Sequence, residues 1–234
     1  PVPAEACLDQ GRGRSGGARR RNDAGAAARL AIMFDAALRP WIDRFLDPVG
    51  RGLARIGVSA NAVTWFGFAL GIAAAVAAAV GAALPAALLI LGNRLCDGLD
   101  GAVARASGSS DLGAYLDITL DFIFYSAVPF GLAIANPDHA LAAAFLIFSF
   151  VGTGSSFLAF AIIAQKRGIS TEARGKKGFF YLGGLTEGGE TIIFLIVVVS
   201  FPQAFMPLAW VFGALCWITT ATRIWSAITR FDKS

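Results

Sequence analysis

The chain has 234 residues, of which 56% are hydrophobic and only 15% are charged, and its mean hydropathy is +0.63. A soluble domain usually carries about 25% charged residues, so this composition excludes an ordinary soluble protein and indicates a membrane protein. The net charge of +4 does not indicate a nucleic-acid-binding protein, because the basic residues follow the membrane topology described below. The three cysteines, Cys7, Cys96 and Cys216, form no CxxC pair, which argues against a zinc site and against a disulfide framework.

The N-terminal part of the chain divides into two segments. Residues 1–28 are rich in Gly, Arg and Ala without apolar periodicity, and we interpret them as a disordered basic tail. Residues 29–56 are predicted to form an amphipathic juxtamembrane helix and a linker, because apolar residues recur at helical spacing from Leu30 to Leu46. A helix lying on the membrane surface and a helix packed on protein both fit this pattern.

The rest of the chain, residues 57–230, contains apolar segments long enough to span a membrane. We predict an all-α integral membrane protein with six transmembrane helices behind the N-terminal surface helix. The expected spans cover about residues 58–80, 84–107, 112–135, 140–165, 179–201 and 205–227. Connections rich in Gly, Pro and Asn separate most of them.

The distribution of basic residues predicts the orientation of these spans. Ten Lys or Arg residues precede the first span and five lie between the fourth and the fifth, whereas the connections after the first, third and fifth spans contain none. Because basic residues accumulate on the cytoplasmic side, both termini are predicted to face the cytoplasm. The basic balance also favours contact with anionic membrane lipids.

The second and third spans carry four aspartates, Asp97, Asp100, Asp117 and Asp121, although an Asp near the centre of a span costs about 2.5 to 3.5 kcal/mol. Residues three or four apart share a helix face, so each span presents one pair. Counted from the turn at Ser109, the two pairs lie at matching depth in an antiparallel hairpin. All four carboxylates are therefore predicted to converge near the cytoplasmic side.

Four neighbouring carboxylates repel one another unless they are protonated or neutralised by cations. Oxygen ligands suit hard ions such as Mg²⁺, Mn²⁺ or Ca²⁺, and four carboxylates can hold two ions, an arrangement used for displacement at phosphorus. Arg105, one helical turn beyond Asp100, suits the binding of phosphate oxygens. A hydrogen-bonded polar cluster or a proton pathway is the alternative interpretation.

The aspartates form part of a longer motif. The string Asp97-Gly-Leu-Asp100-Gly-Ala-Val-Ala-Arg105, seven further residues and Gly113-Ala-Tyr-Leu-Asp117-Ile-Thr-Leu-Asp121 resembles the signature of the CDP-alcohol phosphotransferase (CDP-alcohol phosphatidyltransferase) family in every defined position. The resemblance extends over roughly residues 30–230. It implies that residues 57–230 are a six-helix transmembrane catalytic domain with its site on the cytoplasmic side.

The resemblance also implies roles for individual residues. Asp97, Asp100 and Asp117 would bind two divalent metal ions, Mg²⁺ or Mn²⁺, and Asp121 would complete the site and act as the general base. The donor would be a CDP-activated lipid, and a homodimer is implied as well. The residues expected to contact the nucleotide part of the donor are Asn61, Thr64, Gly101, Ala104, Arg105 and Gly113. From the residues alone, Ser59 or Asn61 is expected to be a helix N-cap.

The acceptor alcohol cannot be assigned from these residues. A phosphorylated acceptor needs cationic partners, for which Lys176, Lys177 and Arg223 are candidates, although surface charge that sets the topology is an equal interpretation. Glu187 and Glu190 share a helix face and either pair with these cations, which we favour, or contact the acceptor. The string from Lys177 to Ile192 resembles a bacterial inner-membrane subgroup of the family.

These features predict a phosphatidyltransferase of phospholipid biosynthesis that moves a phosphatidyl group from CDP-diacylglycerol to a small alcohol and releases CMP. One alternative keeps the fold and uses a soluble CDP-alcohol donor with a lipid acceptor. An alternative of another class is a divalent-cation transporter built on the same carboxylates. A transporter requires a polar route through the periplasmic half, and the first two spans are rich in Ala, Leu and Val there.

Overall fold

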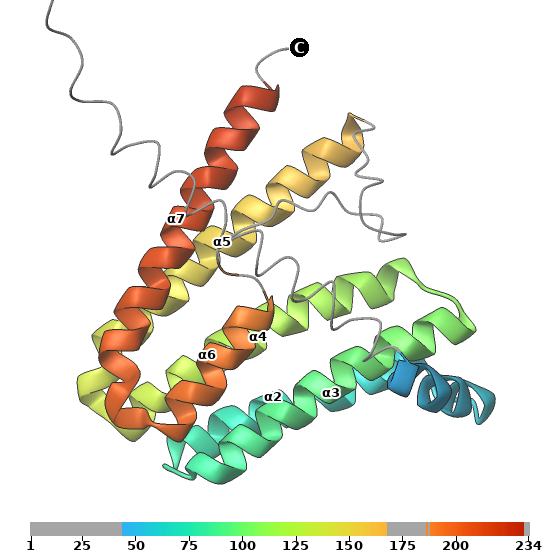
Figure 1. Ribbon diagram of the computed structural model, residues 1–234, viewed down its shortest axis with the longest axis horizontal. Helices are drawn as coiled ribbons and strands as arrows, with labels where there is room; N and C mark the ends of the chain where they lie inside the picture. The colour runs from blue at the N-terminus through green and yellow to red at the C-terminus, as the bar shows by residue number, and fades with distance from the viewer. Residues whose placement is uncertain (1–43, 168–185, 187, 232–234) are drawn as a thin grey trace, which may run out of the picture.

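The computed structural model describes residues 44–167, 186 and 188–231 (Figure 1). Within these residues all regular elements are helical and no strand occurs. The α-helices are α2 (Ala60–Ala79), α3 (Ala83–Ser107), α4 (Asp111–Ala135), α5 (Ala140–Lys166), α6 (Gly188–Ser200) and α7 (Phe205–Phe231), with short 3-10 turns at Pro137–His139 and Pro202–Ala204. Residues 44–55 form a further helix in front of α2.

Four helical segments are long and apolar enough to cross a membrane: Ala60–Ala79, Asp111–Ala135, Pro137–Lys166 and Pro202–Phe231. Helix α3 has a similar length but carries two aspartates and two arginines. The described part of the expected fifth span is the 13-residue helix α6. The all-helical architecture with membrane-spanning helices is therefore confirmed, while the number of six spans stays a prediction.

The predicted hairpin between the second and third spans is present as α3 and α4. Gly108 ends α3 with φ 103°, a backbone conformation that favours glycine. Ser110 then begins α4 as its N-cap, and its side chain accepts a hydrogen bond from the backbone N–H of Gly113. The tight turn joins the C-terminal end of α3 to the N-terminal end of α4.

Helix α2 packs against both arms of this hairpin. Gly131 allows the closest approach, because a Cβ atom at this position would lie 2.3 Å from the carbonyl oxygen of Ala75. The N-terminus of α2 is capped by Ser59, which accepts a hydrogen bond from the backbone N–H of Ala62. Of the two residues expected as the cap, Ser59 takes this role and Asn61 lies inside the helix.

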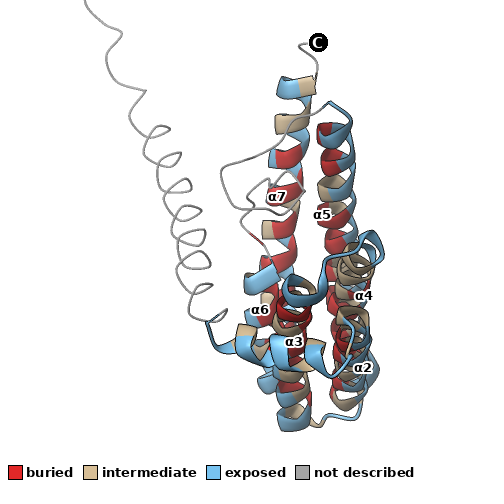
Figure 2. Cartoon of the chain, turned by 90° about the vertical axis from the view of Figure 1, so that its right-hand side faces the viewer, coloured by how far each residue is buried: buried red, intermediate tan, exposed pale blue. Residues whose placement is uncertain are grey.

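The helices form two groups that diverge from one end of the molecule (Figure 1). Helices α2, α3 and α4 extend in one direction, and α5 and α7, which pack on each other, extend in another. Helix α6 lies between the groups and contacts α3. The buried residues line the faces that the helices turn toward one another, and exposed residues occupy the outer faces (Figure 2).

The helix at residues 44–55 packs across α3. A Cβ atom at Gly50 would lie 2.6 Å from the Cβ of Ala102, and a Cβ atom at Gly98 would lie 2.6 Å from the Leu46 side chain. The same helix leaves large apolar residues exposed, including Phe45 and Val49. The described part of the surface helix thus contacts protein on one side and offers an apolar face on another. Residues 29–43 of this prediction, and the predicted tail 1–28, lie outside the described residues.

Candidate metal centre and surrounding pocket

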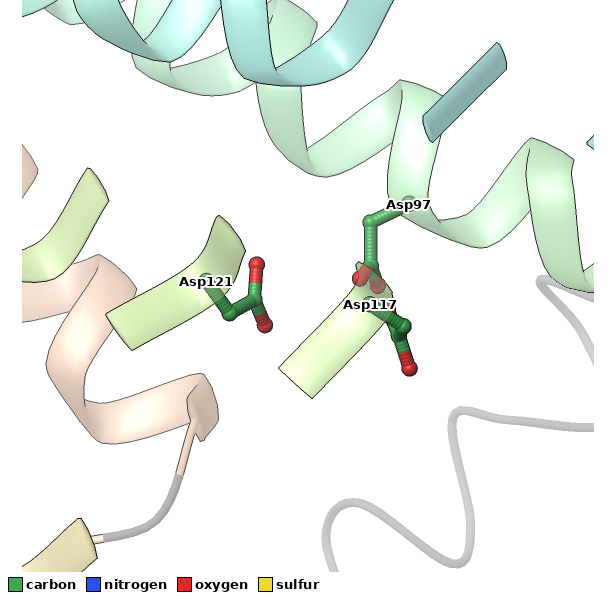
Figure 3. A group of neighbouring side chains, drawn as sticks. All are labelled: Asp97, Asp117 and Asp121. Carbon is green, nitrogen blue, oxygen red and sulfur yellow. The ribbon is translucent and has the colours of Figure 1, made fainter. Parts of the chain in front are cut away.

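Three of the four predicted carboxylates meet between α3 and α4. Asp97 of α3 and Asp117 and Asp121 of α4 each offer one oxygen, and these oxygens lie within 4.8 Å of one another. Figure 3 shows the three side chains as neighbours. The helix-face argument from the sequence therefore places these residues correctly, because one turn of helix brings Asp117 and Asp121 to the same face.

Asp100, the fourth carboxylate, lies in the same pocket but takes a different partner. The hydroxyl of Thr64 on α2 donates a hydrogen bond of 2.7 Å to its Oδ2 atom. The side chain of Asp100 is buried, whereas Asp97, Asp117 and Asp121 are half-buried. The pocket is lined by Thr64, Gly67, Phe68, Asn93, Asp97, Asp100, Asp117, Leu120 and Asp121. The fourth carboxylate thus borders the common group and is held by α2.

The donor set of this pocket fits a divalent cation. The ligand atoms are carboxylate oxygens, which are the ligands that Mg²⁺ and Mn²⁺ prefer in proteins. The three carboxylates are close enough to share an ion, and Asp100 lies at the edge of the same pocket. Because the three carboxylates are only half-buried, a ligand can reach them.

Two residues that the sequence analysis did not single out contact the carboxylates. Arg94 of α3 forms ion pairs with Asp97 and, at 3.8 Å, with Oδ2 of Asp121. The hydroxyl of Tyr125 on α4 donates a hydrogen bond of 2.9 Å to the same Oδ2 atom. The signal was present in the spacing, since Arg94 precedes Asp97 by three residues and Tyr125 follows Asp121 by four.

Asn93 is a third pocket residue that the sequence analysis missed. It is buried, and its side-chain amide donates a hydrogen bond of 2.9 Å to the carbonyl oxygen of Gly67 on α2. It lies one helical turn before Asp97, on the pocket face of α3. Asn93 therefore ties α2 to α3 immediately beside the carboxylates.

The predicted nucleotide-contacting residues lie around the turn between α3 and α4. Thr64 lines the pocket itself. The Asn61 side-chain oxygen lies against Gly113, where an added Cβ atom would be 3.1 Å from it. The guanidinium of Arg105 lies next to Gly101, where an added Cβ atom would be 3.5 Å from Nη1. Ala104, half-buried, occupies the same turn of α3.

The guanidinium of Arg105 reaches a partner that the sequence analysis did not identify. Its Nη2 and Nε atoms donate hydrogen bonds of 2.7 and 3.1 Å to Oδ1 of Asp47 in the helix at residues 44–55. Both side chains are substantially exposed. Arg105 was predicted to contact the donor, and the structure adds that the surface helix holds its planar group.

The predicted acceptor contacts are only partly described. Lys176, Lys177 and Glu187 lie outside the described residues, and Glu190 lies in the first turn of α6. Arg223 of α7 is buried, donates a hydrogen bond of 2.9 Å to the carbonyl oxygen of Thr153 on α5 and lies 5.5 Å above the Phe157 ring. Arg223 does not line the carboxylate pocket. Its pairing with the two glutamates stays a prediction.

The start of α6 connects the carboxylate pocket with the surroundings of Arg223. On one side, a Cβ atom at Gly188 would lie 3.5 Å from the Tyr125 hydroxyl, which itself contacts Asp121. On the other side, the Thr186 hydroxyl donates a 3.2 Å hydrogen bond to that of Thr219, one helical turn before Arg223. Thr186 and Gly188, two positions apart in the chain, therefore contact the neighbourhoods of the buried cation and of the carboxylates.

Comparisons with known proteins point to one family. A family model for CDP-alcohol phosphatidyltransferase matches residues 57–225. The inner membrane protein YnjF of Escherichia coli (strain K12) is 50% identical over 195 residues, covering 83% of this chain and 95% of that protein. The archaetidylinositol phosphate synthase of Pyrococcus horikoshii is 27% identical over 196 residues, covering 83% of this chain and 97% of that protein.

The same fold occurs in the phosphatidylinositol phosphate synthase PgsA1 of Mycobacterium tuberculosis. Its crystal structure with CDP-DAG bound matches with a TM-score of 0.64 at 24% identity, over 80% of this chain and 94% of that chain. Its crystal structure in complex with manganese and citrate matches with a TM-score of 0.60 at 27% identity, over 76% of this chain and 87% of that chain.

Proposed function

Because the chain belongs to the CDP-alcohol phosphatidyltransferase family, we propose that it transfers a phosphatidyl group from CDP-diacylglycerol to a small alcohol and releases CMP. Membership confirms the resemblance drawn from the motif and makes the chain a phosphotransferase, which leaves the divalent-cation transporter without support. Its similarity to YnjF makes it a bacterial inner membrane protein. The donor, the acceptor and the roles of single residues are the proposal.

The observation that carries this function is the meeting of Asp97, Asp117 and Asp121 within 4.8 Å in a membrane helix hairpin. Such a group is costly in a membrane unless cations neutralise it. We propose that these three residues and Asp100 hold two divalent ions, Mg²⁺ or Mn²⁺. Bound ions would neutralise the pyrophosphate of the donor and the charge that develops on the leaving CMP. The manganese complex of PgsA1 supports this assignment.

The proposed reaction uses Asp121 as the general base. The acceptor hydroxyl oxygen forms a bond with the β-phosphorus, and the bond between that phosphorus and the bridging oxygen breaks, so that CMP leaves. Asp121 accepts the proton of the attacking hydroxyl as general base. Thr64 holds Asp100 through its hydrogen bond, which keeps this carboxylate at the edge of the pocket.

The donor contacts are proposed for the residues of the motif and the start of α2. The cytidine diphosphate part would be bound by residues at the start of α2, the end of α3 and the start of α4, namely Asn61, Thr64, Gly101, Ala104, Arg105 and Gly113. Gly113 supports this role because the absence of a side chain there leaves room for the side-chain oxygen of Asn61. Asp47 would hold the guanidinium of Arg105 through its Nε and Nη2 atoms and so fix the position of its charge beside the phosphate oxygens. The CDP-DAG complex of PgsA1 supports a CDP-lipid donor.

The acceptor is proposed to bind between Asp121 and the start of α6. Thr186 and Gly188 lie between the carboxylate pocket and the buried guanidinium of Arg223, so an anionic acceptor on this side would be attracted to that charge. Lys176, Lys177, Glu187 and Glu190 belong to the same part of the sequence. A phosphorylated polyol is the first acceptor to test, because a relative of this chain is named as an archaetidylinositol phosphate synthase.

The decisive experiment measures CMP release by the purified protein. The protein is incubated with CDP-diacylglycerol, Mg²⁺ or Mn²⁺ and single alcohols, including inositol phosphate, glycerol 3-phosphate and serine. Release with one alcohol, abolished by EDTA and restored by the metal, is the expected result. Release only from a water-soluble CDP-alcohol with a lipid acceptor would exchange the two roles, and no release from folded protein with any pair would refute the proposal.

The role of Asp121 is tested separately. Asp121→Asn keeps the shape of the side chain but removes its capacity to accept a proton, so CMP release is expected to fall to background while CDP-diacylglycerol still binds. Donor binding is measured with the purified variant in the presence of Mn²⁺. If the variant loses donor binding as well, the lost activity follows from a lost metal ligand, and the role of Asp121 as base is not supported.

A further inference from the structure

We propose that Tyr125 and Arg94 are positioning residues that hold the carboxylate of Asp121 in its working orientation. This inference rests on the proposed role of Asp121 and adds two residues that lie outside the family motif. The three side chains form one chain of contacts. The Arg94 Nη1 atom donates to the Tyr125 oxygen at 3.4 Å, and the Tyr125 hydroxyl donates to Oδ2 of Asp121 at 2.9 Å.

The Tyr125 ring is fixed independently of its hydroxyl. The residue is buried, and its ring lies 5.5 Å from that of Phe124 and 6.2 Å from that of Phe122, measured between centroids. Core packing alone would be satisfied by a phenylalanine. The hydroxyl instead projects to Asp121, with Gly188 of α6 on its other side. A rigid ring therefore delivers one hydrogen bond at a defined place beside the pocket.

Arg94 determines the direction of that hydrogen bond. Because its guanidinium donates to the Tyr125 oxygen, the hydroxyl proton is directed to Asp121. Arg94 also pairs directly with Asp97 and with Oδ2 of Asp121, so it joins the carboxylates of α3 and α4. Connected hydrogen bonds of this kind strengthen one another in a setting with little water.

The contacts that Tyr125 and Arg94 make with Asp121 both fall on Oδ2, which restricts rotation of the carboxyl group. A general base must lie within about 2.6 to 3.2 Å of the proton that it accepts, and a displacement of about 1 Å can cost roughly 100-fold in rate. Residues that orient a metal-binding carboxylate typically contribute about 10- to 100-fold to metal affinity or activity. The contacts of Tyr125 and Arg94 are of the kind that orients such a carboxylate.

The test uses two readouts, the CMP-release kinetics and the binding of Mn²⁺ followed by electron paramagnetic resonance. Tyr125→Phe is expected to lower kcat and Mn²⁺ affinity by about 10-fold or more while the donor KM stays within about twofold. Arg94→Gln is expected to lower kcat further, without a matching fall in Mn²⁺ affinity, because removing the guanidinium also removes a charge that repels the ion. Arg94→Lys keeps the charge without the planar fork and is expected to recover part of the loss.

The matched control is Tyr115→Phe, since Tyr115 lies on the same helix and is 65% exposed. The inference would be overturned if Tyr125→Phe had the same kcat and the same Mn²⁺ affinity as the wild-type protein. A variant that only melts at a lower temperature, with neither quantity changed, would overturn it as well. If Arg94→Gln does not fold, Tyr125→Phe and Arg94→Lys decide. If the wild-type protein releases no CMP, the proposed function fails, and Mn²⁺ binding still tests the positioning of Asp121.

Discussion

At the scale of single residues, the Thr64 hydroxyl is the contact by which α2 holds the carboxylate of Asp100. Its oxygen lies 2.7 Å from Oδ2 of Asp100 and 3.0 Å from the carbonyl oxygen of Ala60 in its own helix, and its single proton is directed to the carboxylate, the shorter contact. A hydrogen bond to a charged group is worth about 1.5 to 3 kcal/mol. Asp100 is buried, so losing this donor leaves its charge less well solvated.

We predict that Thr64→Val, which keeps the shape of the side chain, weakens Mn²⁺ binding and CMP release by about 10-fold or more, whereas Thr64→Ser retains most of both. Calorimetric titration with Mn²⁺ measures the first quantity. Thr229→Val is the control, because Thr229 is exposed on α7 and bonds only to carbonyl oxygens of its own helix. Equal affinities of wild type and Thr64→Val would show that Asp100 does not depend on α2.

The sequence predicted the carboxylates better than their partners. Helical spacing determines which residues share a face, so Asp97, Asp117 and Asp121 could be brought together from the sequence. Spacing does not determine side-chain rotamers, and the partnership of Asp100 with Thr64 across 36 residues was therefore not predicted. The pairing of Arg105 with Asp47 spans 58 residues and depends on the packing of two helices.

At the scale of helices, the contact between α2 and α4 depends on one missing side chain. A Cβ atom at Gly131 would lie 2.3 Å from the carbonyl oxygen of Ala75, closer than atoms can approach. The backbone of α2 cannot rotate out of the way as a flexible side chain can. An added Cβ atom at Gly131 would therefore force α4 away from α2. Because α4 also carries Asp117 and Asp121, this contact sets the depth of two carboxylates in the hairpin.

Gly131→Ala is therefore expected to lower the stability by about 1 to 3 kcal/mol despite the higher helix propensity of alanine. The measurement is the melting temperature in detergent, followed by intrinsic fluorescence. Gly52→Ala is the control, because nothing lies within 4 Å of its added methyl group in the helix at residues 44–55. A variant Gly131→Ala that melts like the wild type would contradict the close approach of the two helices.

Helix positions were largely predictable because apolar runs and the residues that interrupt them are local features of the sequence. The expected spans 84–107 and 112–135 agree with α3 and α4 to within one residue. The last helix extends to Phe231, beyond the expected residue 227, since Trp225 and Ile228 continue the apolar pattern past Arg223. Within the described residues, the expected span 179–201 appears as α6 from Gly188.

At the scale of the whole molecule, the placement of basic residues predicts the orientation in the membrane. The turn between α3 and α4 and the start of α2 lie at the end that we propose to face the cytoplasm, with both termini. The connections at Pro137–His139 and Pro202–Ala204 contain no Lys or Arg and would face the opposite side. A homodimer, implied by the family resemblance, also stays a prediction.

Cysteine labelling tests this orientation. Ser109→Cys and Asp138→Cys are introduced separately into a chain without Cys7, Cys96 and Cys216, since both positions are exposed. In intact spheroplasts a membrane-impermeant maleimide is expected to modify Asp138→Cys, and Ser109→Cys only after permeabilisation. The reversed pattern would place the carboxylate pocket on the periplasmic side. Retained activity of each variant in membranes serves as the control for folding.

The polar second half of α3 has a consequence for how the protein enters the membrane. Arg94, Asp97 and Asp100 would each cost up to about 2.5 to 3.5 kcal/mol if α3 met lipid alone, which offsets much of the gain from its apolar first half. Thr64 and Tyr125, which partner this polar face, come from the helices made just before and just after it. During biogenesis α3 is therefore expected to leave the translocon together with α2 and α4, as a three-helix unit.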